Sequence, residues 1–138
     1  MPIDTLRSFM EGDLEAVLAL NNSAAPAVNE LTPSDLEWFQ EVSHLFLVSE
    51  RKVDEKTQIT GFLIGLTGPG VDYQSINYNW FTSRYENFLY VDRVVVDESS
   101  WSQGNGRRFY EALASSGSNQ PVMCAEVNSK PRNERSLK

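Results

Sequence analysis

The sequence predicts a mixed α/β fold in which strands alternate with amphipathic helices. Residues 88–96 form an almost continuous apolar run, as expected for a strand covered on both faces. A glycine-containing turn and a helix-type pattern over 103–115 follow, and a second apolar run lies at 121–127. This order predicts a strand–helix–strand crossover whose two strands are parallel.

The length and composition predict one folded domain. A chain of 138 residues is long enough for one hydrophobic core and short for two. Hydrophobic residues make up 41% and charged residues 22%, which is the balance of a globular rather than a disordered protein. We therefore expect residues 1–138 to form a single domain.

The first half of the chain carries local signals for a strand, two helices and a strand pair. Threonine caps helices well and proline suits the first helical turn, so Thr32-Pro33 predicts a helix start. Apolar residues at helical spacing after Asp13 predict another. The expected strands lie at residues 4–9, 45–48 and 59–66, with a charged hairpin turn at 51–57 between the last two.

Residues 67–86 are predicted to be a long connection. Loops of this length in a compact domain are usually functional or packed by their own side chains. This one contains several tyrosines and Trp80. From the sequence, a functional loop and an aromatic lid over the core remain equally open.

Charge and residue counts argue against several classes of function. A net charge of −7 opposes non-specific nucleic-acid binding, whereas it would attract a cationic amine or serve solubility. Cys124 is the only cysteine and His44 the only histidine, so an internal disulfide, a histidine-based metal site and a Ser-His-Asp triad are not expected. Without a signal peptide or a membrane-spanning run, we expect a cytoplasmic protein that binds neither nucleic acid nor membrane.

The turn before the predicted helix over 103–115 has the composition of an anion site. Gly104 and Gly106 flank Asn105, and glycines let a phosphate approach the backbone N–H groups of a first helical turn. No Lys-Ser/Thr pair follows as in a P-loop, and Phe109 stands where the dinucleotide motif needs a third glycine. A tight turn that requires positive φ is the structural alternative.

The residues around this turn resemble the acetyl-CoA motif of the GNAT superfamily of N-acetyltransferases. The similar positions are Val94-x-Val96, Trp101-x-x-Gly104-x-Gly106, and downstream Glu126-Val127-Asn128 followed by Asn133-x-x-Ser136. Trp101 departs from the family pattern, which usually has arginine or glutamine at that position. The two glycines that must admit the phosphates are intact.

The resemblance implies an α+β fold of the acyl-CoA N-acyltransferase type, with a mixed, mainly antiparallel sheet flanked by helices. It also implies that the domain is truncated at the C-terminus, since the family's last helix, the tyrosine acid it often carries and its terminal strands would fall beyond Lys138. The strand at 121–127 would then present an exposed edge. We expect the chain to form a homodimer through that edge, or to be poorly soluble and weakly active.

The activity implied by the resemblance is transfer of an acetyl group from the cosubstrate acetyl-CoA to a primary amine of a small molecule or peptide by direct attack. The alternative is a non-catalytic acetyl-CoA-binding or interaction domain that lacks the acid. The residues that the resemblance assigns to acetyl-CoA binding are Val94, Val95, Val96, Trp101, Gln103, Gly104, Asn105, Gly106, Arg107 and Asn133.

Catalysis would need a base for the amine proton and an acid for the departing thiolate. The candidate bases are Glu126, Asp92 and Glu86, and the candidate acids are Tyr90 and Tyr78. For Asp92, a structural ion pair with the adjacent Arg93 is the alternative.

Overall fold

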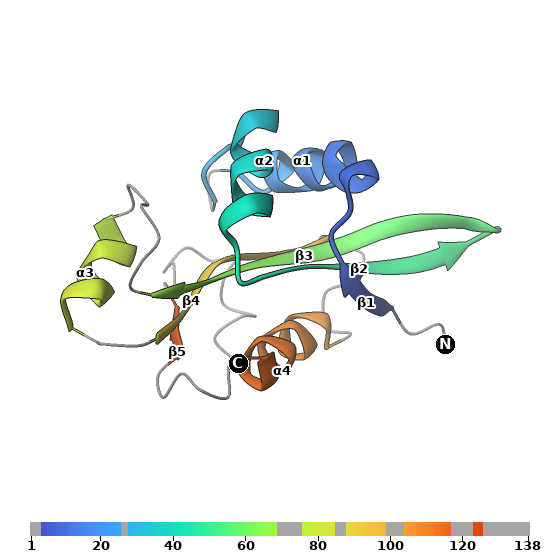
Figure 1. Ribbon diagram of the computed structural model, residues 1–138. Helices are drawn as coiled ribbons and strands as arrows, with labels where there is room; N and C mark the ends of the chain where they lie inside the picture. The colour runs from blue at the N-terminus through green and yellow to red at the C-terminus, as the bar shows by residue number, and fades with distance from the viewer. Residues whose placement is uncertain are drawn as a thin grey trace.

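The structure is a computed structural model that describes residues 4–25, 28–68, 76–84, 88–98, 104–116 and 123–125. These residues form a sheet in the order β1-β2-β3-β4-β5, with helices on both faces (Figure 1). The strands are β1 (Thr5–Ser8), β2 (Leu45–Val53), β3 (Lys56–Gly68), β4 (Phe88–Val96) and β5 (Met123–Ala125). The helices are α1 (Leu14–Ser23), α2 (Pro33–Val42), α3 (Ile76–Arg84) and α4 (Asn105–Ser116), and a 3₁₀ turn (Glu11–Asp13) precedes α1.

The sheet is mixed and mainly antiparallel, as expected. The pairs β1–β2, β2–β3 and β3–β4 are antiparallel, whereas β4 and β5 are parallel. The chain passes through α4 between β4 and β5, which confirms the predicted crossover. Within the described part of the chain β5 is an outer strand, and a homodimer through its edge stays a prediction.

The two larger hydrophobic clusters lie on opposite faces of the sheet, because successive strand residues point to opposite sides. Helices α1 and α2 cover one face and α4 covers the other (Figure 1). The cluster on the α1/α2 side contains Phe9, Val17, Leu36, Phe39, Phe46, Val48, Phe62, Ile64 and Val95. The cluster on the α4 side contains Leu47, Leu63, Leu89, Val91, Phe109 and Leu113.

The β2–β3 hairpin is longer than predicted. The expected turn at 51–57 is wrong, because pairing continues to Val53 opposite Lys56 and only Asp54 and Glu55 form the turn. Their φ angles of 50° and 67° fit a two-residue hairpin turn that follows the strand twist. The hairpin extends past the helices in Figure 1, so its strand ends carry exposed charged residues. Their sequence pattern is therefore that of a loop.

A helix interrupts the predicted connection at 67–86. Helix α3 was missed because its polar and aromatic residues form no clear apolar stripe. Tyr78 is 1% exposed, lies edge-on to Tyr90 with ring centroids 5.3 Å apart, and donates a hydrogen bond to the Thr67 carbonyl at 2.8 Å. For Tyr78 the packing interpretation therefore holds.

The two N-terminal helices begin in different ways. Thr32 Oγ1 accepts a hydrogen bond from the Asp35 amide at 3.2 Å, and Asp35 Oδ2 accepts one from the Thr32 amide at 2.8 Å. This reciprocal cap confirms the predicted start of α2. Helix α1 does begin after Asp13, but the Asp13 side chain makes no capping bond to that helix.

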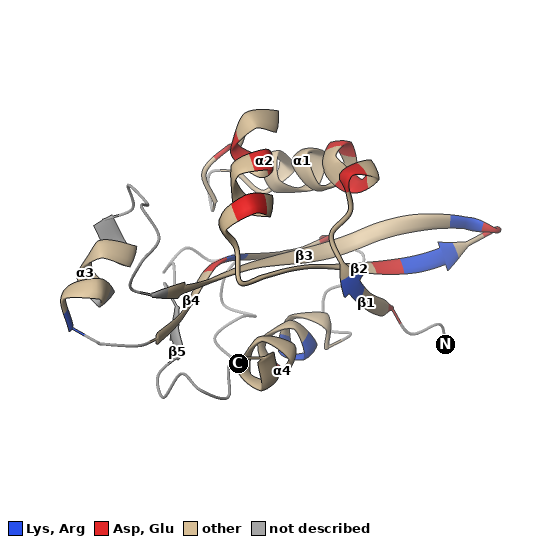
Figure 2. Cartoon of the chain, in the orientation of Figure 1, with Lys and Arg blue, Asp and Glu red and all other residues tan. Residues whose placement is uncertain are grey.

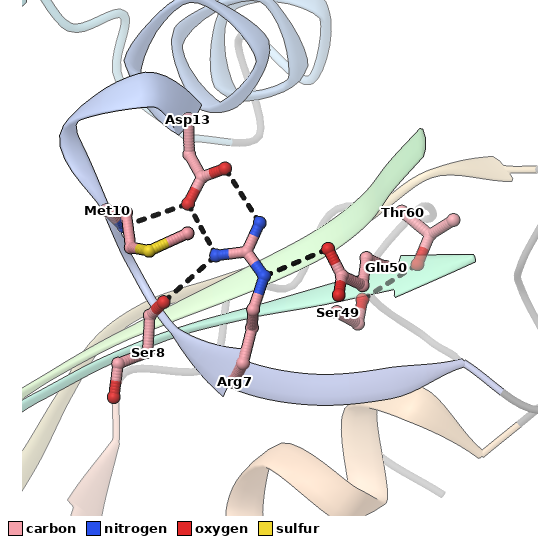
Figure 3. A network of polar contacts seen from close by, with 7 residues as sticks. All are labelled: Arg7, Ser8, Met10, Asp13, Ser49, Glu50 and Thr60. Atoms are coloured by element: carbon pink, nitrogen blue, oxygen red, sulfur yellow. Dashed lines mark hydrogen bonds and ion pairs between the residues drawn. The ribbon is translucent and has the colours of Figure 1, made fainter. Parts of the chain in front are cut away.

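Asp13 instead takes part in an ion-pair network with Arg7 of β1 (Figure 3). Arg7 Nη1 and Nη2 donate to the two Asp13 oxygens at 2.8 Å each, and Arg7 Nε donates to Glu50 Oε2 at 2.9 Å. Asp13 Oδ2 also accepts from the Met10 amide at 2.8 Å. The network joins β1, the start of α1 and β2.

Two glycines of β3 lie beneath α4 and allow it to approach the sheet. A Cβ at Gly61 would lie 2.9 Å from the Val95 carbonyl oxygen and 3.3 Å from the Phe109 ring. A Cβ at Gly65 would lie 2.7 Å from Leu113 Cδ1. Because distances below 3.0 Å force a shift, Gly65 sets how closely α4 packs, whereas Gly61 leaves room for the β4 backbone and brings the Phe109 ring of α4 into tight contact.

Gly61→Ala should lower the free energy of unfolding by about 2 kcal/mol, because the new methyl group meets a backbone oxygen that cannot easily move. Gly12→Ala is the matched control, since a Cβ there meets nothing within 4 Å and the change should stay within about 0.5 kcal/mol. Urea unfolding of both variants measures the difference. Equal stability of the two variants would contradict this account of the packing.

Candidate functional site

The candidate site is the first turn of α4, which follows β4. Gly104 has φ +81°, a conformation that favours glycine. The Arg108 amide donates to the Gly104 carbonyl at 3.0 Å, so the amides of Asn105, Gly106 and Arg107 precede the first helical bond. Such N–H groups, with the partial positive charge of the helix end, suit an anionic ligand.

The backbone conformation explains why position 104 is a glycine, but it does not explain the glycine at position 106. It has no positive φ, and a Cβ added there would meet no atom within 4 Å among the described residues. Alanine favours a helix by about 1 kcal/mol over glycine, so the described fold gives no reason for glycine here. A ligand lying against the backbone at Gly106 would give one.

A β-bulge in β4 shapes the strand beside this turn. Arg93 pairs with Ile64 and Val91 with Gly65, so Asp92 is the additional residue of the bulge. Val91 and Val94 therefore both contact the α4-side cluster although three positions separate them. The parallel pairing with β5 that the structure describes covers Leu89–Val91, and Val94 and Val95 lie beyond it.

The structure places the described candidates for acetyl-CoA binding along this strand end and turn. Val94 and Val96 are half-buried against the α4-side cluster, whereas Val95 is 5% exposed in the cluster on the other face. Arg107 is exposed, and its Nε donates to Glu111 Oε1 at 2.9 Å. The candidates Trp101, Gln103, Glu126, Asn133 and Glu86 lie outside the described residues.

Asp92 forms the ion pair that was its structural alternative. Its Oδ2 accepts from Arg93 Nε at 2.7 Å, and the two side chains are 4% and 9% exposed. Arg93 Nη1 also donates to Asn21 Oδ1 at 3.0 Å and to the Asn29 carbonyl at 3.1 Å, which ties β4 to the end of α1 and the segment after it. A catalytic role for Asp92 stays a prediction.

Tyr90 lies at the other end of β4 from the turn. It is 1% exposed and belongs to an aromatic cluster with Phe88 and Tyr78. Its catalytic role likewise stays a prediction.

Burial raises the pKa of Tyr110, a phenol on α4 that packs against the same cluster as Val94 and Val96, so Tyr110 keeps its proton at neutral pH.

The Asn105 side chain is directed into the protein. Its Nδ2 donates to Asp4 Oδ2 at 2.6 Å, and Asp4 also accepts from Thr60 Oγ1 and from Arg51 Nε at 2.6 Å each. Arg108 Nη1 donates to the Asp4 carbonyl at 2.5 Å. The backbone of the turn, rather than the Asn105 amide group, is therefore what a ligand would meet. Sequence reasoning missed Asp4 altogether.

Hydrogen bonds control the charge of the two buried N-terminal carboxylates. Burial alone would raise the pKa of Asp4, but the bonds from Arg51, Thr60 and Asn105 outweigh it and hold the pKa below its ordinary value of 3.8. The Arg7 hydrogen bonds lower the pKa of Asp13 in the same way. Both side chains are therefore ionised at neutral pH.

No protein-family model and no curated protein matches the sequence. Solved structures match along nearly the whole chain. A structure described as a phosphinothricin N-acetyltransferase has TM-score 0.60 and 25% identity over 97% of this chain and 78% of its own. Naa20 of Chaetomium thermophilum with a bisubstrate analogue has TM-score 0.73 and 19% identity, with coverage of 96% and 67%. The aminoglycoside acetyltransferase AAC(6')-Iy, bound to a bisubstrate analog built on CoA, has TM-score 0.64 and 13% identity, with coverage of 97% and 86%.

The chain has the fold of the GNAT superfamily of N-acetyltransferases, which confirms the resemblance at the level of the fold. A structure described as a transcriptional regulator from Bacillus halodurans C-125 is similar too, with TM-score 0.69 and 16% identity over 97% of this chain and 88% of its own. Fold alone therefore does not fix the activity. Within the described ranges no helix is long and apolar enough to cross a bilayer, and no group of three or more metal-ligating side chains comes together.

Acid should destabilise the fold through Asp4 and Asp13. A carboxylate whose native pKa is lowered stabilises the fold above its unfolded-state pKa and loses that contribution as the pH falls through the native value. The free energy of unfolding should therefore decline from about pH 4 downward, and less steeply in Asp13→Asn. Urea unfolding across this range measures how the free energy of unfolding changes with pH in both proteins. Identical slopes would show that Asp13 does not contribute to the acid destabilisation.

Proposed function

We propose that the chain is an acetyltransferase that moves an acetyl group from acetyl-CoA to a primary amine of a small molecule or peptide. The observation that carries the proposal is Gly106, a helical glycine that the described fold does not require, at a helix start that suits a phosphate. The GNAT fold supports it, since AAC(6')-Iy, which shares the fold, was crystallised with CoA and with a CoA-based analog.

In this proposal the amides from Gly104 to Arg107, together with that of Gln103, bind the pyrophosphate of acetyl-CoA. The pantetheine arm lies beside Val94–Val96 like an added strand, beyond the stretch where β4 pairs with β5. A backbone N–H near Val94 polarises the thioester carbonyl. The neutral amine then attacks that carbonyl directly, a base takes the amine proton, and the thiolate leaves.

Charge on the α1/α2 layer favours a cationic acceptor. Residues 11–42 contain no lysine or arginine, and Figure 2 shows acidic residues on both helices. The exposed acids of this layer are Glu11, Glu15, Glu30, Asp35, Glu37 and Glu41. Such a field attracts cations and raises their association rate. Amines are protonated at neutral pH, so a base near the reaction centre would still be required.

The alternative is a non-catalytic acetyl-CoA-binding or interaction domain. It is favoured by the surroundings of the three described catalytic candidates, because Asp92 pairs with Arg93, and Tyr90 and Tyr78 pack against each other among aromatic rings. Acetyl-CoA turnover with small polyamines, aminoglycosides and peptide amines separates the two functions. Thiol release with one of these amines supports the enzyme, whereas CoA binding without turnover supports the alternative.

Gly106→Val should weaken CoA binding about tenfold, because the side chain occupies the space through which the pyrophosphate approaches the backbone. Calorimetric titration of CoA measures the change. Ser115→Val places the same β-branched residue at an exposed position nearer the end of α4 and should bind CoA as the native chain does. A folded Gly106→Val protein with native affinity would refute the site. A native chain that binds no CoA would refute both the transferase and the acetyl-CoA-binding domain and leave only the interaction domain.

A further inference from the structure

Four buried polar residues from distant parts of the chain meet at the first turn of α4. They are Asp4, Ser49, Thr60 and Asn105, none more than 2% exposed. Ser49 Oγ lies 2.8 Å from Thr60 Oγ1, a bond drawn in Figure 3, and Thr60 in turn donates to Asp4. Buried polar groups are costly unless they are hydrogen-bonded, and here each has a partner.

A bulge brings Thr60 into this cluster. Ser49 pairs with Gly61 and Glu50 with Ile59, so Thr60 is the additional residue of β3. Its carbonyl accepts from the Asp97 amide at 2.8 Å, which fixes the chain as it leaves β4 toward the glycine turn. Its hydroxyl reaches Asp4. The bulge therefore links the exit from β4 to the carboxylate that holds the α4 start.

Asp4 is suited to this place because its carboxylate meets three hydrogen-bond donors among the described residues. Arg51 Nε donates to one carboxylate oxygen, and Thr60 and Asn105 both donate to the other. An ionised carboxylate accepts all three bonds, whereas an asparagine would turn its own N–H group toward one of the donors. The negative charge is offset by Arg51, whose side chain is 16% exposed.

We propose that Asp4 is a positioning residue for the acetyl-CoA site: it holds Asn105 by its side chain and Arg108 through its own carbonyl, and so fixes the backbone N–H groups of the first α4 turn in the arrangement that binds pyrophosphate. The inference rests on the proposed function. Asp4 acts through Asn105 and does not touch the ligand. Donors that are held in place before binding lose less conformational freedom on binding, which raises affinity.

The test is a double-mutant cycle on the full chain, with Asp4→Ala, Asn105→Ala and the double variant, read out as the CoA dissociation constant. Each single change should weaken binding about tenfold, and the double variant should bind no more weakly than either single one. Asp13→Ala is the matched control. It removes another buried, arginine-bound carboxylate near the N-terminus but contacts no residue of α4 in the bonds described, so CoA affinity should stay native.

The outcomes separate this inference from the proposed function. A native chain that binds no CoA overturns both. Three results would overturn the positioning role alone while the native chain binds CoA. The first is unchanged CoA affinity in an Asp4→Ala protein that circular dichroism shows to be folded. The others are an equal loss of CoA affinity in Asp13→Ala and full additivity of the two single losses in the double variant. If Asp4→Ala fails to fold, Asn105→Ala decides by itself. Native CoA affinity in Asn105→Ala would show that Asn105, through which Asp4 is proposed to act, has no effect on binding.

Discussion

The close approach of α4 to the sheet is the constraint on which the site depends. Helix and sheet can meet at this distance only because β3 has glycines where Phe109 and Leu113 lie. Contact at these two residues fixes the rotation of α4 about its axis and hence the direction of its first turn. The position of the candidate anion site is therefore set by apolar packing several residues away from it.

Two bulges then adapt a regular sheet to that helix. The bulge at Asp92 shifts the side-chain alternation of β4, so that valines on both sides of it pack toward α4. The bulge at Thr60 turns a hydroxyl of β3 toward a carboxylate from the N-terminal segment. In each case one additional residue changes which face a run of side chains occupies, without ending the strand.

Local signals explain which parts of this structure could be predicted from the sequence. An apolar run marks the bounds of β4, and a threonine cap followed by proline marks the start of α2. Both predictions are correct. Helix α3 lacks an apolar stripe, and the ends of the β2–β3 hairpin are charged on both faces, so neither had a signal that pattern analysis could use. The sequence indicates the glycine turn, but only the structure distinguishes its two glycines. Glycine at position 104 is explained by the positive φ, whereas no described neighbour explains the glycine at position 106.

The contact between Asp4 and Asn105 joins positions 101 residues apart, and a contact of that separation leaves no trace in a single sequence. It also has a thermodynamic consequence. If the N-terminal segment helps to order the turn that binds a ligand, then by reciprocity the ligand must help to order the N-terminal segment. Occupancy of the turn would suppress local opening of β1, an outer strand held to the described sheet by β2, and its amide hydrogens would exchange more slowly. An outer strand that is far from the ligand in sequence would thus report whether the turn is occupied.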